Sequence, residues 1–276
     1  MNIDKTLQKR ILTGAIGIVL LFALIILGGT VGITLITAIL VVLCAIEFFH
    51  MFYSYPPRPL QKWSGVLLTF LLFAIFVMEE VYLLTIFVLI VMGLFVTTLV
   101  LAKNVSQDEF SSLISDLGNL FLGAIYIAIT FAFLPKLRGI PNTGIMLTIL
   151  AFVIPWSGDT GAYFVGKKWG KRPLFQAVSP HKTVEGFLGG VGACIGTLLI
   201  LKIIFFSTLT VIDCFFLGLL GTIFAHIGDL FESLLKRAHG LKDSGYLIPG
   251  HGGFLDRFDA FMFSTPIIYI YAVLFI

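Results

Sequence analysis

The sequence predicts an all-α, polytopic integral membrane protein with about nine transmembrane helices and a cytoplasmic N-terminus. Hydrophobic residues make up 58% of the 276 residues, only 12% are charged, and the mean hydropathy is +1.05. Because soluble domains have about 25% charged residues, this composition excludes a water-soluble domain, and its hydrophobicity excludes intrinsic disorder. Apolar runs of about 20 residues, the length that crosses a bilayer, recur along the whole chain.

Nine apolar runs account for most of the chain. Their expected bounds are 11–27, 31–52, 63–78, 81–102, 117–134, 144–165, 184–206, 210–231 and 254–276. The first run is long and a second follows almost at once, so we interpret it as a retained helix and not as a cleaved signal. The third run is the shortest, and without it the C-terminus would change sides.

Lysine and arginine are distributed unequally between alternate connections. With nine crossings from a cytoplasmic N-terminus, all 18 of these residues fall on the inside except Lys136, Arg138 and Lys202. Because positive residues favour the cytoplasmic side, we expect a multi-pass protein of the cell inner (cytoplasmic) membrane with its active site on the cytoplasmic side. The sequence has no obvious internal repeat, which argues against a transporter built from inverted repeats.

The chain changes character near residue 135. We expect residues 1–135 to form N-terminal transmembrane scaffold helices, and residues 136–276 to form a catalytic region with cytoplasmic loops at 166–183 and 232–253. In the first half, Glu47 and His50 lie one helical turn apart, and a polar pair at the interface explains them better than a functional role. Ionisable groups inside spans cost about 2.5–3.5 kcal/mol, so those of the second half are the functional candidates.

The first candidate is Asp159, which lies among Pro155, Gly158 and Gly161 in an otherwise apolar run. Proline and glycine there predict a bent backbone, and irregular backbone at membrane depth needs protein or a wet cavity around it. A proline kink with Asp159 bonded to a neighbouring helix is one explanation. The other is a carboxylate that faces a polar cavity, and we hypothesise that this cavity is shared with Asp229.

The second candidate is the segment that contains Ser179, Lys182, Thr183 and Glu185. Thr183 can cap the following helix, with Glu185 in its first turn. The same helix N-terminus, with Ser179 and Lys182 beside it, would also suit a phosphate group, so both interpretations stay open. The remaining cations of this segment are expected to attract anionic lipid headgroups: Lys167, Lys168, Lys171 and Arg172.

The third candidate is the end of the eighth predicted helix. Residues three, four, seven and eight positions apart share one helical face, and here they are Asp229, Glu232, Ser233, Lys236 and Arg237. An amphipathic helix end with its own ion pairs is the structural alternative. Asp229 and Asp256, near the ends of two adjacent helices, can converge, and such carboxylates suit Mg²⁺ together with substrate phosphates. The absence of a Cys/His cluster argues against zinc.

Residues 233–259 resemble the signature of the phosphatidate cytidylyltransferases, also called CDP-diacylglycerol synthases. The signature begins with Ser-x-apolar-Lys-Arg, followed after four residues by Lys-Asp-x-small. After two more residues it ends with apolar-Pro-x-His-Gly-Gly-apolar-x-Asp-Arg-apolar-Asp. Every specified position is matched here. Segments 159–166 and 179–186 are also similar to the family. Val184 stands where an aromatic residue is common, and Ala260 stands where the family usually has serine, which removes a hydroxyl group.

The resemblance implies a nucleotidyltransferase of phospholipid biosynthesis that converts CTP and phosphatidic acid into CDP-diacylglycerol and pyrophosphate with Mg²⁺. Metal binding is expected at Asp229 and Asp256, and catalytic roles at these two with Lys236 and Arg257. Substrate contacts are expected at Ser179, Lys182, Thr183, Glu185, Ser233, Arg237, Lys242, His251, Asp259 and Asp159.

Expected partners are CTP, phosphatidic acid and membrane lipids, without nucleic acid. A second cation and a homodimer stay open. The alternatives to this function are a CTP-dependent lipid kinase and a polytopic transporter.

Overall fold

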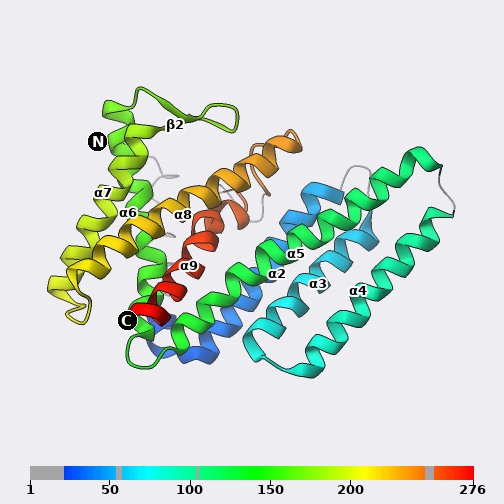
Figure 1. The fold of residues 1–276 in the computed structure, drawn as a ribbon, viewed down its shortest axis with the longest axis horizontal. Helices are drawn as coiled ribbons and strands as arrows, with labels where there is room; N and C mark the ends of the chain where they lie inside the picture. Colours follow the sequence, from blue (N-terminus) through cyan, green and yellow to red (C-terminus); the bar gives the residue numbers. More distant parts are fainter. Residues whose placement is uncertain (1–21, 54–57, 104–105, 246–251) are drawn as a thin grey trace, which may run out of the picture.

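The computed structural model describes residues 22–53, 58–103, 106–245 and 252–276. Within these ranges, eight α-helices are long and apolar enough to cross a membrane, and they run between two ends of the molecule (Figure 1). The prediction of an all-α polytopic membrane protein is thereby confirmed. Residues 22–27 of the first predicted span are helical. The rest of that span lies outside the described ranges, so the ninth crossing stays a prediction.

The helices are α2 (Gly29–Tyr53), α3 (Pro59–Met78), α4 (Val81–Ala102), α5 (Phe110–Gly139), α6 (Gly144–Trp169), α7 (Val184–Ile204), α8 (Val211–Ala238) and α9 (Leu255–Phe275). The shortest predicted span, 63–78, is a full helix because it starts earlier, at Pro59, and proline is well accepted in a first helical turn. A single 3-10 turn, η1 (Gln107–Glu109), precedes α5.

The two predicted cytoplasmic loops are more ordered than the sequence suggested. Strands β1 (Pro173–Phe175) and β2 (Ser179–Thr183) form an antiparallel hairpin between α6 and α7, so much of loop 166–183 is a hairpin. Helix α8 continues to Ala238, which makes 232–238 of the predicted loop 232–253 helical. In Figure 1 the C-terminal ends of α2, α4, α6 and α8 lie at the upper end.

Helices α2, α3 and α5 form the core of the N-terminal half. Phe48 and Phe49 of α2 are fully buried, and Gly65 of α3 and Gly123 of α5 lie against their rings. An added Cβ would approach ring atoms to 2.6 Å at Gly65 and 2.5 Å at Gly123, so small residues allow these helices to approach closely, as is usual in membrane proteins. Helix α4 buries no residue and lies at the edge of the group (Figure 1).

Helices α6 to α9 form the second group, which joins the first mainly through contacts of α9 and α6 with α5. Helix α6 stays α-helical through Pro155, so the irregular backbone expected near Asp159 is not observed. Gly161 instead faces α7, where an added Cβ would lie 2.3 Å from the Ala193 Cβ and 2.9 Å from the Gly189 carbonyl oxygen. The glycine therefore permits close packing of two helices.

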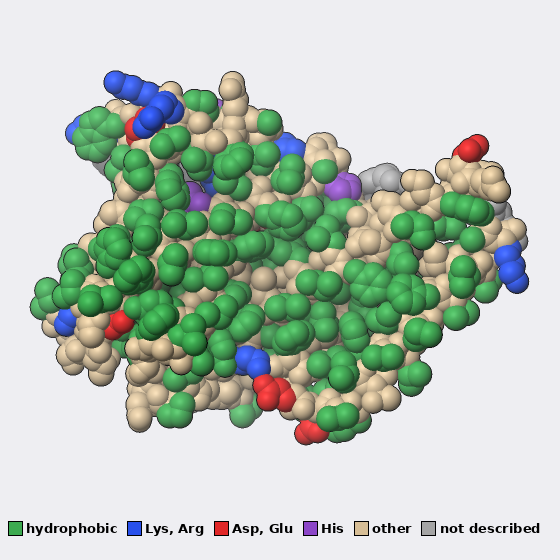
Figure 2. All heavy atoms as spheres, viewed as in Figure 1, with side chains coloured by type: hydrophobic (Ala, Val, Ile, Leu, Met, Phe, Trp, Pro, Cys, Tyr) green, Lys and Arg blue, Asp and Glu red, His purple; other side chains and the backbone are tan. Residues whose placement is uncertain are grey.

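The surface of the molecule agrees with a bilayer environment. Hydrophobic side chains cover the middle of the face shown in Figure 2, whereas most lysine, arginine, aspartate and glutamate side chains on this face lie near its ends and edges. Since little apolar surface of a transmembrane helix needs protein cover in lipid, the large exposed apolar area of these helices is expected.

Candidate active site

Two cavities share Asp159 as part of their walls. The first, here named the polar cavity, measures about 460 Å³ and lies between α6, the hairpin, α7 and α8. The second, the apolar cavity, measures about 450 Å³ and lies between α2, α5, α6 and α9. The Asp159 side chain is solvent-accessible. One residue therefore belongs to the walls of two cavities whose other lining residues differ in character.

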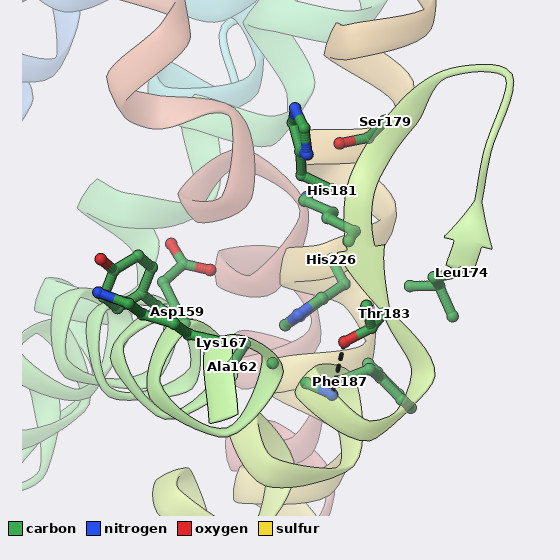
Figure 3. A pocket seen from close by; sticks show the side chains of 13 residues that line it. Asp159, Ala162, Lys167, Leu174, Ser179, His181, Thr183, Phe187 and His226 are labelled. Atoms are coloured by element: carbon green, nitrogen blue, oxygen red, sulfur yellow. Dashed lines mark hydrogen bonds between the residues drawn. The ribbon is translucent and has the colours of Figure 1, made fainter. Parts of the chain in front are cut away.

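The hairpin supplies one wall of the polar cavity. Strand β2 carries Ser179, His181, Lys182 and Thr183 along it, while Asp159 approaches from α6 (Figure 3). The Thr183 hydroxyl accepts a hydrogen bond of 3.1 Å from the Gly186 amide and caps α7, which confirms the predicted helix cap. The phosphate-binding interpretation of the same residues stays a prediction.

Lys182 joins the hairpin to α8. Its ammonium group forms an ion pair with the Asp229 carboxylate, and Ser233 donates a long hydrogen bond of 3.4 Å to the other Asp229 oxygen. Lys182 lines the same cavity as Asp159, whereas Asp229 is not among the lining residues of either cavity. The hypothesis that Asp159 and Asp229 share a cavity stays a prediction.

Asp256, at the start of α9, is held more completely. Lys236 donates to its Oδ1 at 2.6 Å and also forms an ion pair with the fully buried Glu232 of α8. Oδ2 accepts three hydrogen bonds, from the Ser244 amide at 2.9 Å, the Ser244 hydroxyl at 2.9 Å and the Gly253 amide at 3.0 Å. The Asp256 carboxylate therefore has a fixed orientation, with Oδ1 toward Lys236.

Carboxylates are chemically suitable ligands for the predicted Mg²⁺, whose binding at Asp229 and Asp256 stays a prediction. No group of three or more His, Cys, Asp or Glu residues arranged for a metal occurs in the part of the chain that the structure describes, and Mg²⁺ bound with substrate phosphates needs only one or two carboxylates. Asp229 and Asp256 each hold a lysine ammonium group, so both positions attract cations. Asp229 is the more open of the two, since Asp256 could bind a metal only where Lys236 now contacts Oδ1.

The apolar cavity ends on charged residues. Ile33, Leu40 and other apolar side chains line most of it, and Asp159, Asp256, Arg257 and Asp259 line its polar end. The Asp259 Oδ1 accepts a hydrogen bond of 2.7 Å from the Ala260 amide. Ala260 also lines this cavity, so the unusual alanine places a methyl group in the wall where the family usually has a hydroxyl.

Five predicted substrate residues line neither cavity or are not described, and one of them is Ser233, whose bond to Asp229 is given above. Glu185 accepts hydrogen bonds from the Lys171 and Arg172 amides and from the Arg172 side chain. It holds the start of the hairpin and lines neither cavity, so a structural role explains it. Arg237 is exposed and donates to the Leu241 carbonyl, and Lys242 is exposed outside both cavities. His251 lies outside the described residues.

Sequence reasoning overlooked two residues of the polar cavity. Lys167, which we expected to attract lipid headgroups, lines this cavity. His226 of α8 lines it too, is 7% exposed, and has its Nδ1 3.0 Å from the Thr222 carbonyl oxygen. Because a carbonyl only accepts, Nδ1 carries the proton. The signal for His226 was its place one helical turn before Asp229.

A third overlooked residue, Glu47, is buried in the protein. It contacts the signature segment through the Leu255 amide, which the sequence analysis did not foresee. The interpretation of Glu47 and His50 as a polar pair at the membrane interface stays a prediction.

Comparison with known proteins places the chain in a family. A family described as the cytidylyltransferase family matches residues 8–275. Phosphatidate cytidylyltransferase of Bacillus subtilis (strain 168) is 40% identical over 182 residues, which cover 66% of this chain and 65% of that protein. The Staphylococcus aureus (strain COL) protein of the same name is 40% identical over 167 residues, which cover 60% of this chain and 62% of that protein. The chain thus spans a little under two thirds of the length of these relatives. With the family matched over nearly its full length, this chain belongs to the cytidylyltransferase family.

Proposed function

We propose that this protein transfers the cytidylyl group of CTP to phosphatidic acid, giving CDP-diacylglycerol and pyrophosphate in phospholipid biosynthesis. The names of its relatives support this activity. The observation that carries the proposal is the position of Asp159 in the walls of both cavities. An enzyme that joins a nucleotide to a lipid needs a polar and an apolar compartment that meet at the reacting groups.

The polar cavity suits the nucleoside triphosphate. Lys182, Lys167 and Ser179 line it, and the N-terminus of α7 begins at its wall. Cations and the free amides of a helix N-terminus both attract phosphate. Phe187 and His226, which pack edge to face with ring centroids 5.2 Å apart, add flat surfaces for a nucleobase.

The apolar cavity suits the lipid. Its aliphatic lining accommodates acyl chain, and Arg257 at its polar end is placed for the phosphate of phosphatidic acid. That phosphate is already an anion and is itself the nucleophile, so no protein base is required. One of its oxygens forms the new bond to the α-phosphorus of CTP while the bond from that phosphorus to the pyrophosphate oxygen breaks.

The barrier to this reaction is the repulsion between two anions. Lys182 and Lys236 are held beside the reacting region by Asp229 and Asp256, and fixed cations stabilise charge that develops on phosphate. We assign Mg²⁺ to the same two aspartates. When bound, the ion would neutralise phosphate charge and favour departure of pyrophosphate.

The site would lie on the cytoplasmic side of the cell inner membrane. An active site on the opposite face of the membrane would lie in a different compartment from its substrate CTP. The distribution of Lys and Arg also favours the cytoplasmic orientation. Cysteine accessibility on either face of sealed vesicles, with single cysteines introduced in the hairpin and in the connection after α5, would measure the orientation.

Substrate specificity tests the proposed activity. Purified protein is incubated with phosphatidic acid, Mg²⁺ and each labelled nucleoside triphosphate in turn, and pyrophosphate and liponucleotide are measured. We expect equal amounts of pyrophosphate and CDP-diacylglycerol with CTP. Release of CDP with a phosphorylated lipid would instead identify a CTP-dependent lipid kinase. Lack of any turnover, with substrate movement across vesicles, would identify a transporter.

A further inference from the structure

Glu47 is a buried carboxylate in the otherwise apolar N-terminal helices. It lies on α2 and is only 3% exposed. An acidic group in such a place is costly unless it is hydrogen-bonded. The partners that it has therefore indicate why it is there.

Two of its partners belong to the segment that leads into α9. Glu47 Oε2 accepts a hydrogen bond of 2.9 Å from the Leu255 amide. The Ser244 hydroxyl oxygen lies 3.3 Å from the same Oε2, although its single proton has the shorter contact, 2.9 Å, with Asp256 Oδ2. Glycines make room for the carboxylate, because an added Cβ would lie 2.7 Å from Glu47 Oε1 at Gly245 and 2.5 Å from Oε2 at Gly253. Gly245 and Gly253 thus lie closely against the Glu47 carboxylate.

Two of the same residues also hold Asp256. The Ser244 hydroxyl lies within hydrogen-bond distance of both carboxylates, and the Ser244 and Gly253 amides donate to Asp256 Oδ2. Leu255, whose amide donates to Glu47, is the residue next to Asp256. Glu47 and Asp256 therefore share Ser244 and bind neighbouring backbone amides at the start of α9.

We propose that Glu47 is a positioning residue for the active site. It fixes Ser244 and the first residue of α9, and these in turn occupy Asp256 Oδ2 so that Oδ1 is left for Lys236 and the reacting groups. The N-terminal helices thereby take part in catalysis without contacting substrate. The effect on turnover rests on the proposed function, whereas the effect on backbone protection does not.

Hydrogen exchange measures this role without substrate. The full-length protein in detergent is compared with Glu47→Ala and Glu47→Gln by mass spectrometry of peptides covering residues 239–245 and 252–258. Loss of a hydrogen bond to a charged group is expected to speed exchange of these peptides in Glu47→Ala by about tenfold or more. Glu47→Gln retains an acceptor oxygen and should show a smaller increase.

Thr37→Val is the matched control for helix α2. Thr37 is also fully buried and polar, but its hydroxyl bonds to the Ile33 carbonyl of its own helix. This variant should leave exchange near Ser244 and Leu255 unchanged. Unchanged exchange there in Glu47→Ala, or an equal increase in all helices, would overturn the proposal, since the second result would mean general destabilisation only.

Turnover gives a second test, and Ser244→Ala keeps it informative if Glu47→Ala folds poorly. Both variants should lower kcat with little change in KM for CTP, because neither side chain is assigned to substrate. The double variant should be no worse than the poorer single variant, since residues in one network are not additive. Independent, multiplicative losses would contradict the proposal. An activity other than cytidylyl transfer would refute the proposed function and leave the exchange result valid.

Discussion

The N-terminal helices α2 to α5 are on average more apolar than the C-terminal helices α6 to α9, and the two groups place their charges differently. In the first group, ion pairs such as Lys136 with Glu79 at 2.6 Å lie near helix ends. In the second group, ion pairs of Lys182 and Lys236 with aspartates lie beside two cavities. The difference teaches that the location of the charges distinguishes scaffold from site in this protein.

Glu47 is the exception that makes the comparison useful. It belongs to the scaffold by sequence, yet it hydrogen-bonds the backbone beside Asp256. The division near residue 135 therefore describes composition, while the network that orients the site crosses it. The predictions below test how far function is confined to the second group of helices.

The largest effect is expected for the two aspartates assigned to Mg²⁺. Asp229→Ala and Asp256→Ala should each lower turnover by ~1000-fold or more, because they remove charge that organises the reacting phosphates. Asn at either position should be nearly as damaging, since charge and not shape holds a cation. Asp108→Asn, in the exposed η1 turn, is the control from the first group. Near-normal turnover of either alanine variant at limiting Mg²⁺ would refute the assignment.

The second effect concerns the cations of the site. Replacing Lys182, Lys236 or Arg257 by glutamine should lower kcat/KM by ~100-fold, the size of effect seen when one stabilising donor is lost. Lys171→Gln should change it little, because Lys171 is exposed and lines neither cavity. Lys167, which lines the polar cavity, should fall between these limits. Steady-state kinetics on lipid–detergent micelles checks this, and equal mild losses throughout would mean that these charges serve topology alone.

A smaller effect is expected at Asp159. Asp159→Asn should lower turnover by roughly tenfold, the order of one interaction of ~1.4 kcal/mol, without the complete loss expected at Asp229. Thr160→Val is the neighbouring control, since its hydroxyl bonds to the Trp156 carbonyl of its own helix. If Asp159→Asn had the activity of the unaltered protein, the shared wall of the two cavities would carry no function.

The smallest effect on activity should come from a packing change. Gly161→Ala places a methyl group against Ala193 and the α7 backbone, and such overpacking costs about 1–3 kcal/mol. Gly93→Ala on α4, where nothing lies within 4 Å, should not destabilise the protein. Thermal unfolding in detergent, with fluorescence as the readout, compares the two. A similar melting temperature for both variants would mean that α6 and α7 accommodate the added methyl group without loss of stability.

The positions of the helices and of the signature could be predicted from the sequence because both depend on nearby residues. Hydropathy adds up over a window of about 20 residues, so the helices α2 to α9 were all found. The bounds were less accurate, since α5 begins seven residues before its predicted span and α8 ends seven residues after its own. The cap at Thr183 was also local, since a hydroxyl three residues before an amide decides it. The hairpin of β1 and β2 was missed because its strands are short and lack an alternating apolar pattern.

The sequence by itself thus determined the membrane class, the order of the helices and the aspartates and lysines that form the candidate site. Only the tertiary structure decided that Gly161 serves packing and not a bend, that His226 and Lys167 line a cavity, and that Asp256 turns Oδ2 away from Lys236. It also decided the role of Glu47, which bonds to a residue 208 positions away. Such contacts depend on how distant helices pack, and a local pattern of residues carries no information on which buried donor will meet which acceptor.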